Sequence, residues 1–182
     1  MNLWLVRHAQ PVIEPGICYG AMDVSADGPA TELAARALAD VLPMHCRMRV
    51  STLQRCEQLA QCLCGLRPDL RLKQEPRLVE MNFGIYENVA WADIQKDALD
   101  AWTADFAQHR FGGQESVAEF MARVAAVWDE WYAEPAQDQV WITHAGVARA
   151  AVLLQQGSRL PAAAHHWPTH APGFGQWITL AP

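Results

Sequence analysis

Leu3-Trp4-Leu5-Val6-Arg7-His8-Ala9-Gln10 is the stretch that decides the fold, because a run of apolar residues ends there at a cation and an imidazole. A continuous apolar run is typical of a parallel strand that is buried on both faces. Ligands of open α/β sheets bind just beyond the carboxyl ends of such strands. The stretch therefore predicts a central strand with Arg7 and His8 at the mouth of a site. Taken alone, it favours a simpler interpretation, a solvated arginine and a surface histidine, because short motifs often occur by chance.

The size and charge of the chain limit its class. With 182 residues, 51% of them hydrophobic, it is long enough for one compact domain with a sizeable core, which we expect to span residues 1–182. The formal net charge of -6 argues against non-specific nucleic-acid binding, because affinity for a phosphate backbone needs many clustered cations. An anionic ligand would have to be held by a local positive cluster. Apart from Lys73 and Lys96 the cations are arginines, whose planar fork suits phosphate or carboxylate.

Cysteine usage and the terminal segments bear on location. The five cysteines are odd in number and lack the spacing of a redox or zinc motif, so we expect free thiols in a cytoplasmic protein. No basic segment precedes a long apolar one at the N-terminus, and no signal peptide is expected. Residues 160–182 contain no Asp, Glu, Lys or Arg, yet their prolines and histidines argue against a membrane helix.

Hydrophobic periodicity and turn residues predict alternating strands and helices. The expected strands cover residues 3–7, 48–51, 70–73, 139–143 and 173–180. The expected helices cover residues 29–42, 52–63, 89–95, 98–108, 117–132 and 147–155, and a capping box of Ser116 and Glu119 makes the fifth the clearest. Such alternation indicates an α/β three-layer sandwich, in which helices cover both faces of a mainly parallel sheet. The Gly- and Pro-rich stretch 10–28 predicts a long functional loop over one end of that sheet.

A second strand ends in the same way as the first. His144-Ala145-Gly146 follows the strand expected at 139–143, and in both places a small residue after the imidazole lets the backbone approach a ligand closely. If the two strands are neighbours, two histidines and an arginine meet at one end of the sheet. Arg55 falls in the first turn of the helix after the second strand, where a helix N-terminus already favours anions. Such a pocket is suited to a phosphate group.

Together these stretches resemble the histidine phosphatase superfamily, also called the phosphoglycerate mutase-like superfamily. The matching segments occur in the family's order along nearly the whole chain: 5–10, 51–60, 78–87, 112–116 and 142–149. A phosphoglycerate mutase-like fold is therefore implied. Gly16-Ile17-Cys18-Tyr19-Gly20, followed by Asp23, is similar to the small phosphatases related to alpha-ribazole phosphatase.

The resemblance implies a metal-independent phosphomonoester hydrolase that works through a phosphohistidine intermediate, with alpha-ribazole phosphate as one candidate among small phosphorylated metabolites. His8 would be the nucleophile and Glu80 the proton donor to the leaving oxygen. Arg7, Arg55 and His144 would surround the phosphate oxygens. Further contacts to phosphate or substrate are expected from Gln10, Tyr19, Gly20 and Ala145. No metal or other cofactor is implied, and we expect a monomer or homodimer without nucleic-acid or membrane partners.

The chemistry of this mechanism needs these residue types. A neutral imidazole is a good nucleophile near neutral pH, and it leaves again when water attacks phosphohistidine. Arginine forks stabilise charge on the equatorial oxygens of the transferred group. A general acid assists an alkoxide, which is a poor leaving group, so Glu80 would have to carry a proton when substrate is bound.

Other interpretations stay open. Taken singly, Arg55 could be an exposed helix residue, Glu80 a solvated loop carboxylate and His144 a core histidine. For the whole chain, one alternative is a phosphoglycerate-type mutase, which is disfavoured because the longer insertions of the family's mutases are missing. The other is a non-catalytic phosphoester-binding protein on the same fold.

Several loop positions depart from the family's pattern. Ala21 stands where these phosphatases often carry a basic residue, Asn88 takes the place of a usual glycine, and Gln114 interrupts a Gly-Glu-Ser pattern. We expect these loops to shape the pocket for the part of the substrate beyond the phosphate. These departures weaken the assignment of alpha-ribazole phosphate as the substrate.

Overall fold

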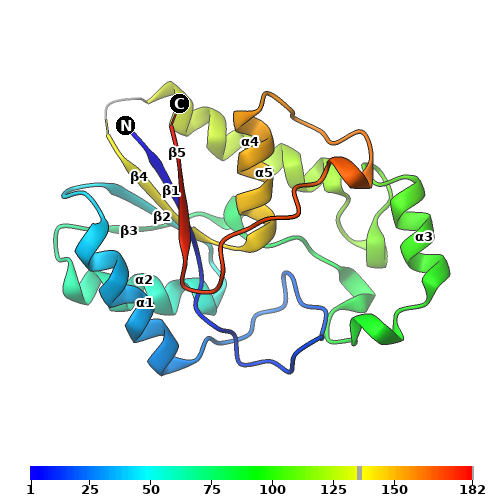
Figure 1. Ribbon diagram of the computed structural model, residues 1–182, viewed down its shortest axis with the longest axis horizontal. Helices are drawn as coiled ribbons and strands as arrows, with labels where there is room; N and C mark the ends of the chain where they lie inside the picture. The colour runs from blue at the N-terminus through cyan, green and yellow to red at the C-terminus, as the bar shows by residue number, and fades with distance from the viewer. Residues whose placement is uncertain (135–136, 182) are drawn as a thin grey trace.

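The computed structural model describes residues 1–134 and 137–181. A five-stranded sheet with the strand order β3-β2-β4-β1-β5 forms its centre (Figure 1). The four neighbouring strands from β3 to β1 pair in parallel, and β5 pairs antiparallel with β1 at one edge. The strands are β1 (Leu3–Arg7), β2 (Arg47–Val50), β3 (Leu72–Gln74), β4 (Gln139–Thr143) and β5 (Trp177–Leu180).

Helices cover both faces of the sheet. They are α1 (Gly28–Val41), α2 (Gln54–Leu66), α3 (Lys96–Ala104), α4 (Val117–Ala133) and α5 (Ala145–Gln155). α1 and α2 pack over Val6 and Val50 on one face, whereas α4 and α5 pack over Leu5 and Trp141 on the other. Figure 1 shows the first pair to the lower left of the strands and the second pair to the upper right. The predicted α/β three-layer sandwich with a mainly parallel sheet is confirmed.

The local sequence explains where two of the helices begin. Asp27 caps α1, because its carboxylate accepts a hydrogen bond of 2.9 Å from the amide of Ala30, and Pro29 follows in the first turn where no amide hydrogen is needed. α4 begins at the predicted capping box, in which the side chains of Ser116 and Glu119 each accept a hydrogen bond from the other residue's amide. These caps satisfy amides that a helix start leaves unpaired.

Some element boundaries differ from the expectations. The last strand begins at Trp177 and not at residue 173, because residues 173–176 form a turn in which the amide of Gln176 donates to the carbonyl of Gly173. The stretch 89–95, expected as a helix, contains a single 3-10 turn at Trp91–Asp93. α5 begins directly after His144, two residues earlier than the periodicity indicated.

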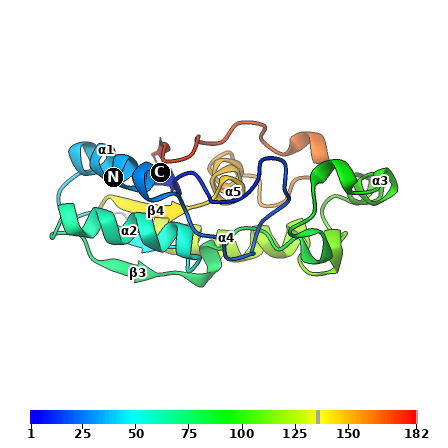
Figure 2. The same ribbon diagram turned by 90° about the horizontal axis from the view of Figure 1, so that it is seen from below.

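The strand register brings the predicted site segments together. Arg7 at the end of β1 pairs with Thr143 at the end of β4, and Val50 at the end of β2 pairs with Ile142. The carboxyl ends of three parallel strands therefore meet at one edge of the sheet. The loop 8–27 crosses this edge, and α3 with its neighbouring short turns extends to one side of it (Figures 1 and 2).

Candidate active site

His8 is held in one tautomer by its own neighbourhood. Its Nδ1 lies 2.7 Å from the carbonyl oxygen of Ala9, which can only accept, so the hydrogen is on Nδ1 and the lone pair is on Nε2. Hydrogen bonds from the His8 amide to the carbonyl of Thr143 and from the Gly175 amide to the carbonyl of His8 fix the backbone on both sides. Burial, reinforced by the positive charge of Arg55, lowers the pKa of His8 from 6.5 to about 3. The imidazole is therefore neutral and nucleophilic at neutral pH.

Arg7 stands beside His8 at the end of β1. Its guanidinium carbon lies 3.8 Å from the centre of the Phe174 ring, and Nη1 donates to the carbonyl of Pro172 at 3.2 Å. The Phe174 ring also lies 5.5 Å from the His8 ring, measured between centroids. The segment before β5 thus holds the arginine in place and shields the nucleophile, which is only 2% exposed.

Arg55 is fully buried at the start of α2. Its Nη2 donates to the carbonyl of Gly20 at 2.6 Å, and its Nη1 donates to the carbonyl of Met22 at 2.8 Å. The Tyr19 ring lies 5.4 Å from the guanidinium carbon. A guanidinium has five N–H groups, so these two bonds leave donors free for an anion while they anchor the loop 19–22 to the strand ends. The helix-start arginine of the sequence is thus an internal cation and not an exposed residue.

His144 is the N-cap residue of α5 and is also buried. Its ring centroid lies 5.2 Å from that of His8, and its Nε2 lies 2.8 Å from the Ser51 hydroxyl. Burial, followed by the charge of Arg55, holds the pKa of His144 well below 6.5. His144 can therefore act at the site as a neutral hydrogen-bond partner beside the N-terminus of α5, which favours an anion.

Glu80 lies in the loop after the short turn Pro76–Leu78 and faces the N-terminus of α5. One carboxylate oxygen accepts from the Gly146 amide at 2.9 Å and the other from the Met81 amide at 3.0 Å. A Cβ atom on Gly146 would lie 2.2 Å from the carboxylate, so only glycine allows this approach. The loop is held from behind by Arg123 of α4, whose guanidinium donates to the carbonyl oxygens of residues 77, 79 and 80.

The structure brings most of the predicted residues together, but not all. Tyr19 and Gly20 adjoin Arg55, and Ala145 opens α5 beside His144. Gln10 is exposed, and its described contact is through the backbone carbonyl, which accepts from the amide of Asp27. Its side chain therefore carries no argument for a substrate contact.

Sequence reasoning missed several residues that position the site. Ser51 bonds His144, Phe174 covers Arg7, and Arg123 supports the Glu80 loop. Glu87 falls within a matching segment, but the sequence alone gave it no role. Its carboxylate accepts from the amides of Ala21, Met22 and Phe83 and so ties two loops of the site together. These partners lie far apart along the chain, and only the fold reveals them.

The loop positions that depart from the family's pattern also have structural consequences. Asn88 has a φ of 67°, in the left-handed region where glycine is favoured and where asparagine is among the better tolerated alternatives. Ala21 and Gln114 line one open hollow together with Glu80. That these loops shape the pocket for the part of the substrate beyond the phosphate stays a prediction.

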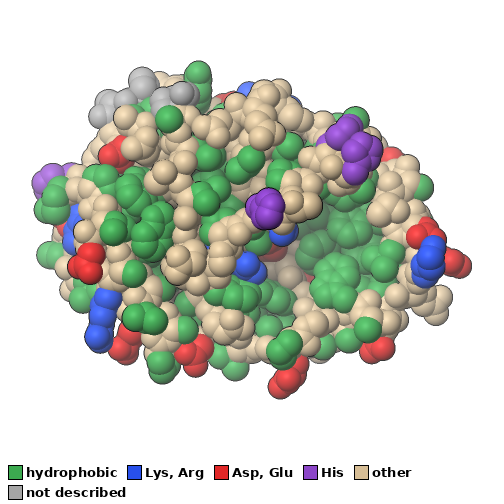
Figure 3. Space-filling view, in the orientation of Figure 1, with side chains coloured by type: hydrophobic (Ala, Val, Ile, Leu, Met, Phe, Trp, Pro, Cys, Tyr) green, Lys and Arg blue, Asp and Glu red, His purple; other side chains and the backbone are tan. Residues whose placement is uncertain are grey.

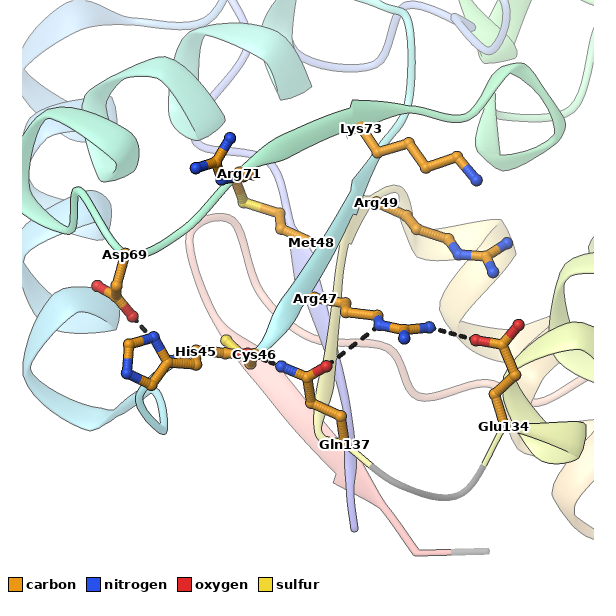
Figure 4. A pocket seen from close by; sticks show the side chains of 10 residues that line it. All are labelled: His45, Cys46, Arg47, Met48, Arg49, Asp69, Arg71, Lys73, Glu134 and Gln137. Atoms are coloured by element: carbon orange, nitrogen blue, oxygen red, sulfur yellow. Dashed lines mark hydrogen bonds and ion pairs between the residues drawn. The ribbon is translucent and has the colours of Figure 1, made fainter.

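A separate groove lies at the opposite end of β2 and β3 (Figure 4). Its cations come from those two strands and the residue before β3: Arg47, Arg49, Arg71 and Lys73. Two of them are balanced by carboxylates of the α4 end, because Arg47 pairs with Glu134 and Arg49 with Glu130. This groove has no pair of buried imidazoles among its described residues, so we place the active site at the carboxyl ends of the strands.

Neither a metal site nor a membrane-spanning helix is found among the described residues. No group of three or more His, Cys, Asp or Glu side chains lies in a position to hold a metal ion. No described helix combines the length and the apolar character needed to cross a membrane.

Comparison with known proteins identifies the family of this site. Residues 3–171 match the histidine phosphatase superfamily (branch 1). The chain belongs to the histidine phosphatase superfamily. The match covers every predicted site residue, and the protein is a phosphatase of this superfamily. No curated protein is significantly similar to the chain in sequence.

Solved structures share the histidine phosphatase fold seen here. The mycobacterial glucosyl-3-phosphoglycerate phosphatase Rv2419c aligns with a TM-score of 0.80 and 24% identity, over 98% of this chain and 88% of that chain. TTHB049 from Thermus thermophilus aligns with a TM-score of 0.74 and 26% identity, over 99% of this chain and 93% of that chain. These neighbours support the phosphoglycerate mutase-like fold that the sequence predicts.

Proposed function

We propose that the protein is a metal-independent phosphomonoester hydrolase that transfers the phosphoryl group of its substrate to Nε2 of His8 and then to water. In the first step Nε2 attacks phosphorus, the bond to the ester oxygen breaks, and Glu80 gives its proton to the departing alkoxide. In the second step water attacks phosphorus, the P–N bond breaks, and Glu80 takes the proton of the water. The products are an alcohol and inorganic phosphate, and the enzyme returns to its starting state.

The observation that carries this proposal is the bond from Nδ1 of His8 to the carbonyl of Ala9. It leaves Nε2 with a lone pair directed away from the backbone, and the lowered pKa keeps that lone pair free of a proton. An in-line displacement needs a fixed nucleophile, and the bond holds the ring in one orientation.

Charge stabilisation comes from groups that surround the imidazole. Arg7 and the remaining donors of Arg55 supply positive charge, and the positive end of α5 beside His144 adds to it. Because these groups are buried or half-buried, their interaction with a phosphoryl group is stronger than it would be in water.

For the substrate we propose a small phosphorylated metabolite, with alpha-ribazole phosphate as the first compound to test. The support is the similarity of Gly16–Gly20 and Asp23 to the small phosphatases of that group, together with the position of Tyr19 and Gly20 against Arg55. The five free cysteines support a cytoplasmic location. We propose a monomer or homodimer that acts on this small substrate without nucleic-acid or membrane partners.

The proposal is tested by hydrolysis of a generic aryl phosphate in the presence of a metal chelator. We expect release of inorganic phosphate by the wild-type protein and none above background from His8→Ala. Full activity in His8→Ala, or loss of wild-type activity on chelation, would contradict it. Incubation with 2- and 3-phosphoglycerate provides the control for a mutase, which would interconvert the two compounds where a hydrolase releases phosphate.

A further inference from the structure

An aromatic cavity of about 260 Å³ opens beside Glu80. We infer that it receives the leaving group of the substrate and that this group carries a flat, uncharged ring system. The inference rests on the proposed function, since it names the substrate class of the same site. Six aromatic side chains from four separate parts of the chain line the cavity: Phe83, Trp91, Trp102, Phe106, Phe120 and Trp167.

The cavity is continuous with the catalytic groups. Glu80 and Gly146, which share a hydrogen bond, are both part of its lining. Arg149 is the third lining residue at this end and lies about one helical turn beyond Gly146 on α5. A phosphoester with its phosphorus at His8 and its bridging oxygen at Glu80 would therefore extend its alcohol part into the cavity.

The lining is selective in its chemistry. Among the described residues that form it, Glu80 and Arg149 are the charged ones, and both lie at the phosphate end. The remainder of the wall is aromatic or aliphatic, and the indole N–H of Trp102 is buried there without a partner in the described part of the chain. One such donor cannot replace the several hydrogen bonds to water that a charged or hydroxyl-rich group would lose. A flat ring would instead bury apolar surface and meet ring faces and edges.

The aromatic side chains of the cavity wall pack against one another. Phe83 contacts Trp91 and Trp102 edge to face, with centroids 5.7 and 6.1 Å apart. Phe106 and Trp167 form another such pair at 6.1 Å. Trp91 is 37% exposed at the rim, which is unusual for a side chain of its size if it served the core alone. Figure 3 shows an apolar hollow on this face with cationic side chains at its edge.

Arg149 makes the end of the cavity near Glu80 polar. Its Nη2 donates to the carbonyl of Thr169 at 3.2 Å, and burial lowers its pKa while the charge of Glu80 raises it. The guanidinium has further donors, which can meet polar atoms that lie close to the ester oxygen. The expected substrate is thus polar near the phosphate and apolar at its far end.

The test compares three phosphoesters of primary alcohols, so that differences in leaving-group basicity are small: naphthylethyl phosphate, ethyl phosphate and glucose 6-phosphate. We expect the kcat/KM for naphthylethyl phosphate to exceed both others by about tenfold or more, because only its ring fills the cavity. Equal kcat/KM for naphthylethyl and ethyl phosphate, with hydrolysis that depends on His8, would overturn the inference and leave the proposed function intact.

Two variants distinguish an effect on the cavity from a general effect on the fold. Trp91→Ala removes a rim residue and should bring the ratio of kcat/KM for naphthylethyl phosphate to that for ethyl phosphate close to one. Trp4→Ala removes a half-buried tryptophan that packs on Trp177, away from the cavity, and should leave the preference unchanged. An unchanged preference in Trp91→Ala, or an equal reduction in Trp4→Ala, would contradict the assignment.

A binding measurement tests the cavity in the absence of hydrolysis. Isothermal titration calorimetry of His8→Ala reports the Kd of each phosphoester, and naphthylethyl phosphate should bind about tenfold tighter than ethyl phosphate. If it binds no tighter, the cavity is not the leaving-group site. If it binds tighter although the wild-type protein hydrolyses neither ester, the cavity binds a flat ring as inferred, but the proposed hydrolysis fails and the ring is not a leaving group.

Discussion

The hydroxyl of Ser51 lies 2.8 Å from Nε2 of His144, and both residues are buried. The two come from the ends of neighbouring strands, 93 residues apart in the chain. The hydroxyl fixes one nitrogen of the imidazole and so decides how the ring meets a phosphoryl group on His8. Ser51 is a positioning residue, because it acts on that group through His144.

Replacement of Ser51 tests this relationship. Ser51→Ala should lower kcat by about five- to tenfold with little change in KM, because one hydrogen bond contributes about 1 to 1.5 kcal/mol. Ser51→Thr keeps the hydroxyl and should recover part of the loss. Cys56→Ala provides a matched control, since Cys56 is equally buried and also adjoins His144. An equal loss in Cys56→Ala and Ser51→Ala would reduce the role of Ser51 to packing.

A side chain at Gly146 should lower activity, because it would displace the Glu80 carboxylate, although it would not disturb the helix. Gly146→Ala places a Cβ 2.2 Å from the Glu80 carboxylate, so the acid must move away from the leaving oxygen. We expect kcat to fall by about ten- to hundredfold, the contribution of a well-placed general acid being about 10² to 10⁴. Thermal unfolding should show no comparable loss of stability, because alanine favours a helix.

Gly65→Ala is the control for that substitution. Gly65 lies in α2, and a Cβ there would meet no atom within 4 Å. Activity of Gly65→Ala should equal that of the wild type. Wild-type activity in Gly146→Ala would show that the position of Glu80 is not constrained by this contact.

Two buried histidines make the stability of the fold depend on pH. The pKa of His8 is about 3 in the folded protein and near 6.5 when unfolded, so between these values the unfolded chain binds a proton that the folded chain does not. The contribution of the neutral His8 to the free energy of unfolding is therefore fully present above about pH 7 and is lost as the pH drops toward 3. Between pH 7.5 and 5 the loss is about 2 kcal/mol. The lowered pKa of His144 adds a change of the same sign.

Urea denaturation at the two pH values measures this change. In His8→Asn the loss of stability between about pH 7.5 and 5 should be smaller by about 2 kcal/mol than in the wild type. His45→Asn is the matched control, because it removes an exposed imidazole outside the active site. A pH dependence that is unchanged in His8→Asn would mean that folding does not lower the pKa of His8.

The sequence predicted the sheet and the residues at its edge for identifiable reasons. The apolar runs before Arg7 and His144 indicated parallel strands, and parallel strands place their carboxyl ends together, which the β1–β4 pairing confirms. The capping box of α4 could be predicted because its two residues lie three positions apart in the sequence. The structure brings Arg7, His8, Arg55, Glu80 and His144 to one place, and their roles stay predictions until activity is measured.

The remainder depends on contacts that no local pattern contains. The bonds from Ser51 to His144 and from the Ala21 amide to Glu87 join positions that only the strand order and the loop paths bring together. The aromatic cavity is assembled from four segments, and the apolar pattern of each segment is also typical of a hydrophobic core. By contrast, the positive φ of Asn88 explains in retrospect why the family prefers glycine there.

The most direct test of the account is to trap the phosphoenzyme. After rapid mixing with an aryl phosphate and quenching in base, which preserves phosphohistidine, mass spectrometry of the digested protein should find one phosphoryl group on the peptide that contains His8. Gly65→Ala should give the same adduct, and His8→Asn should give none. A phosphoryl group on any other residue, or turnover by His8→Asn at the wild-type rate, would contradict the assignment of His8 as the nucleophile.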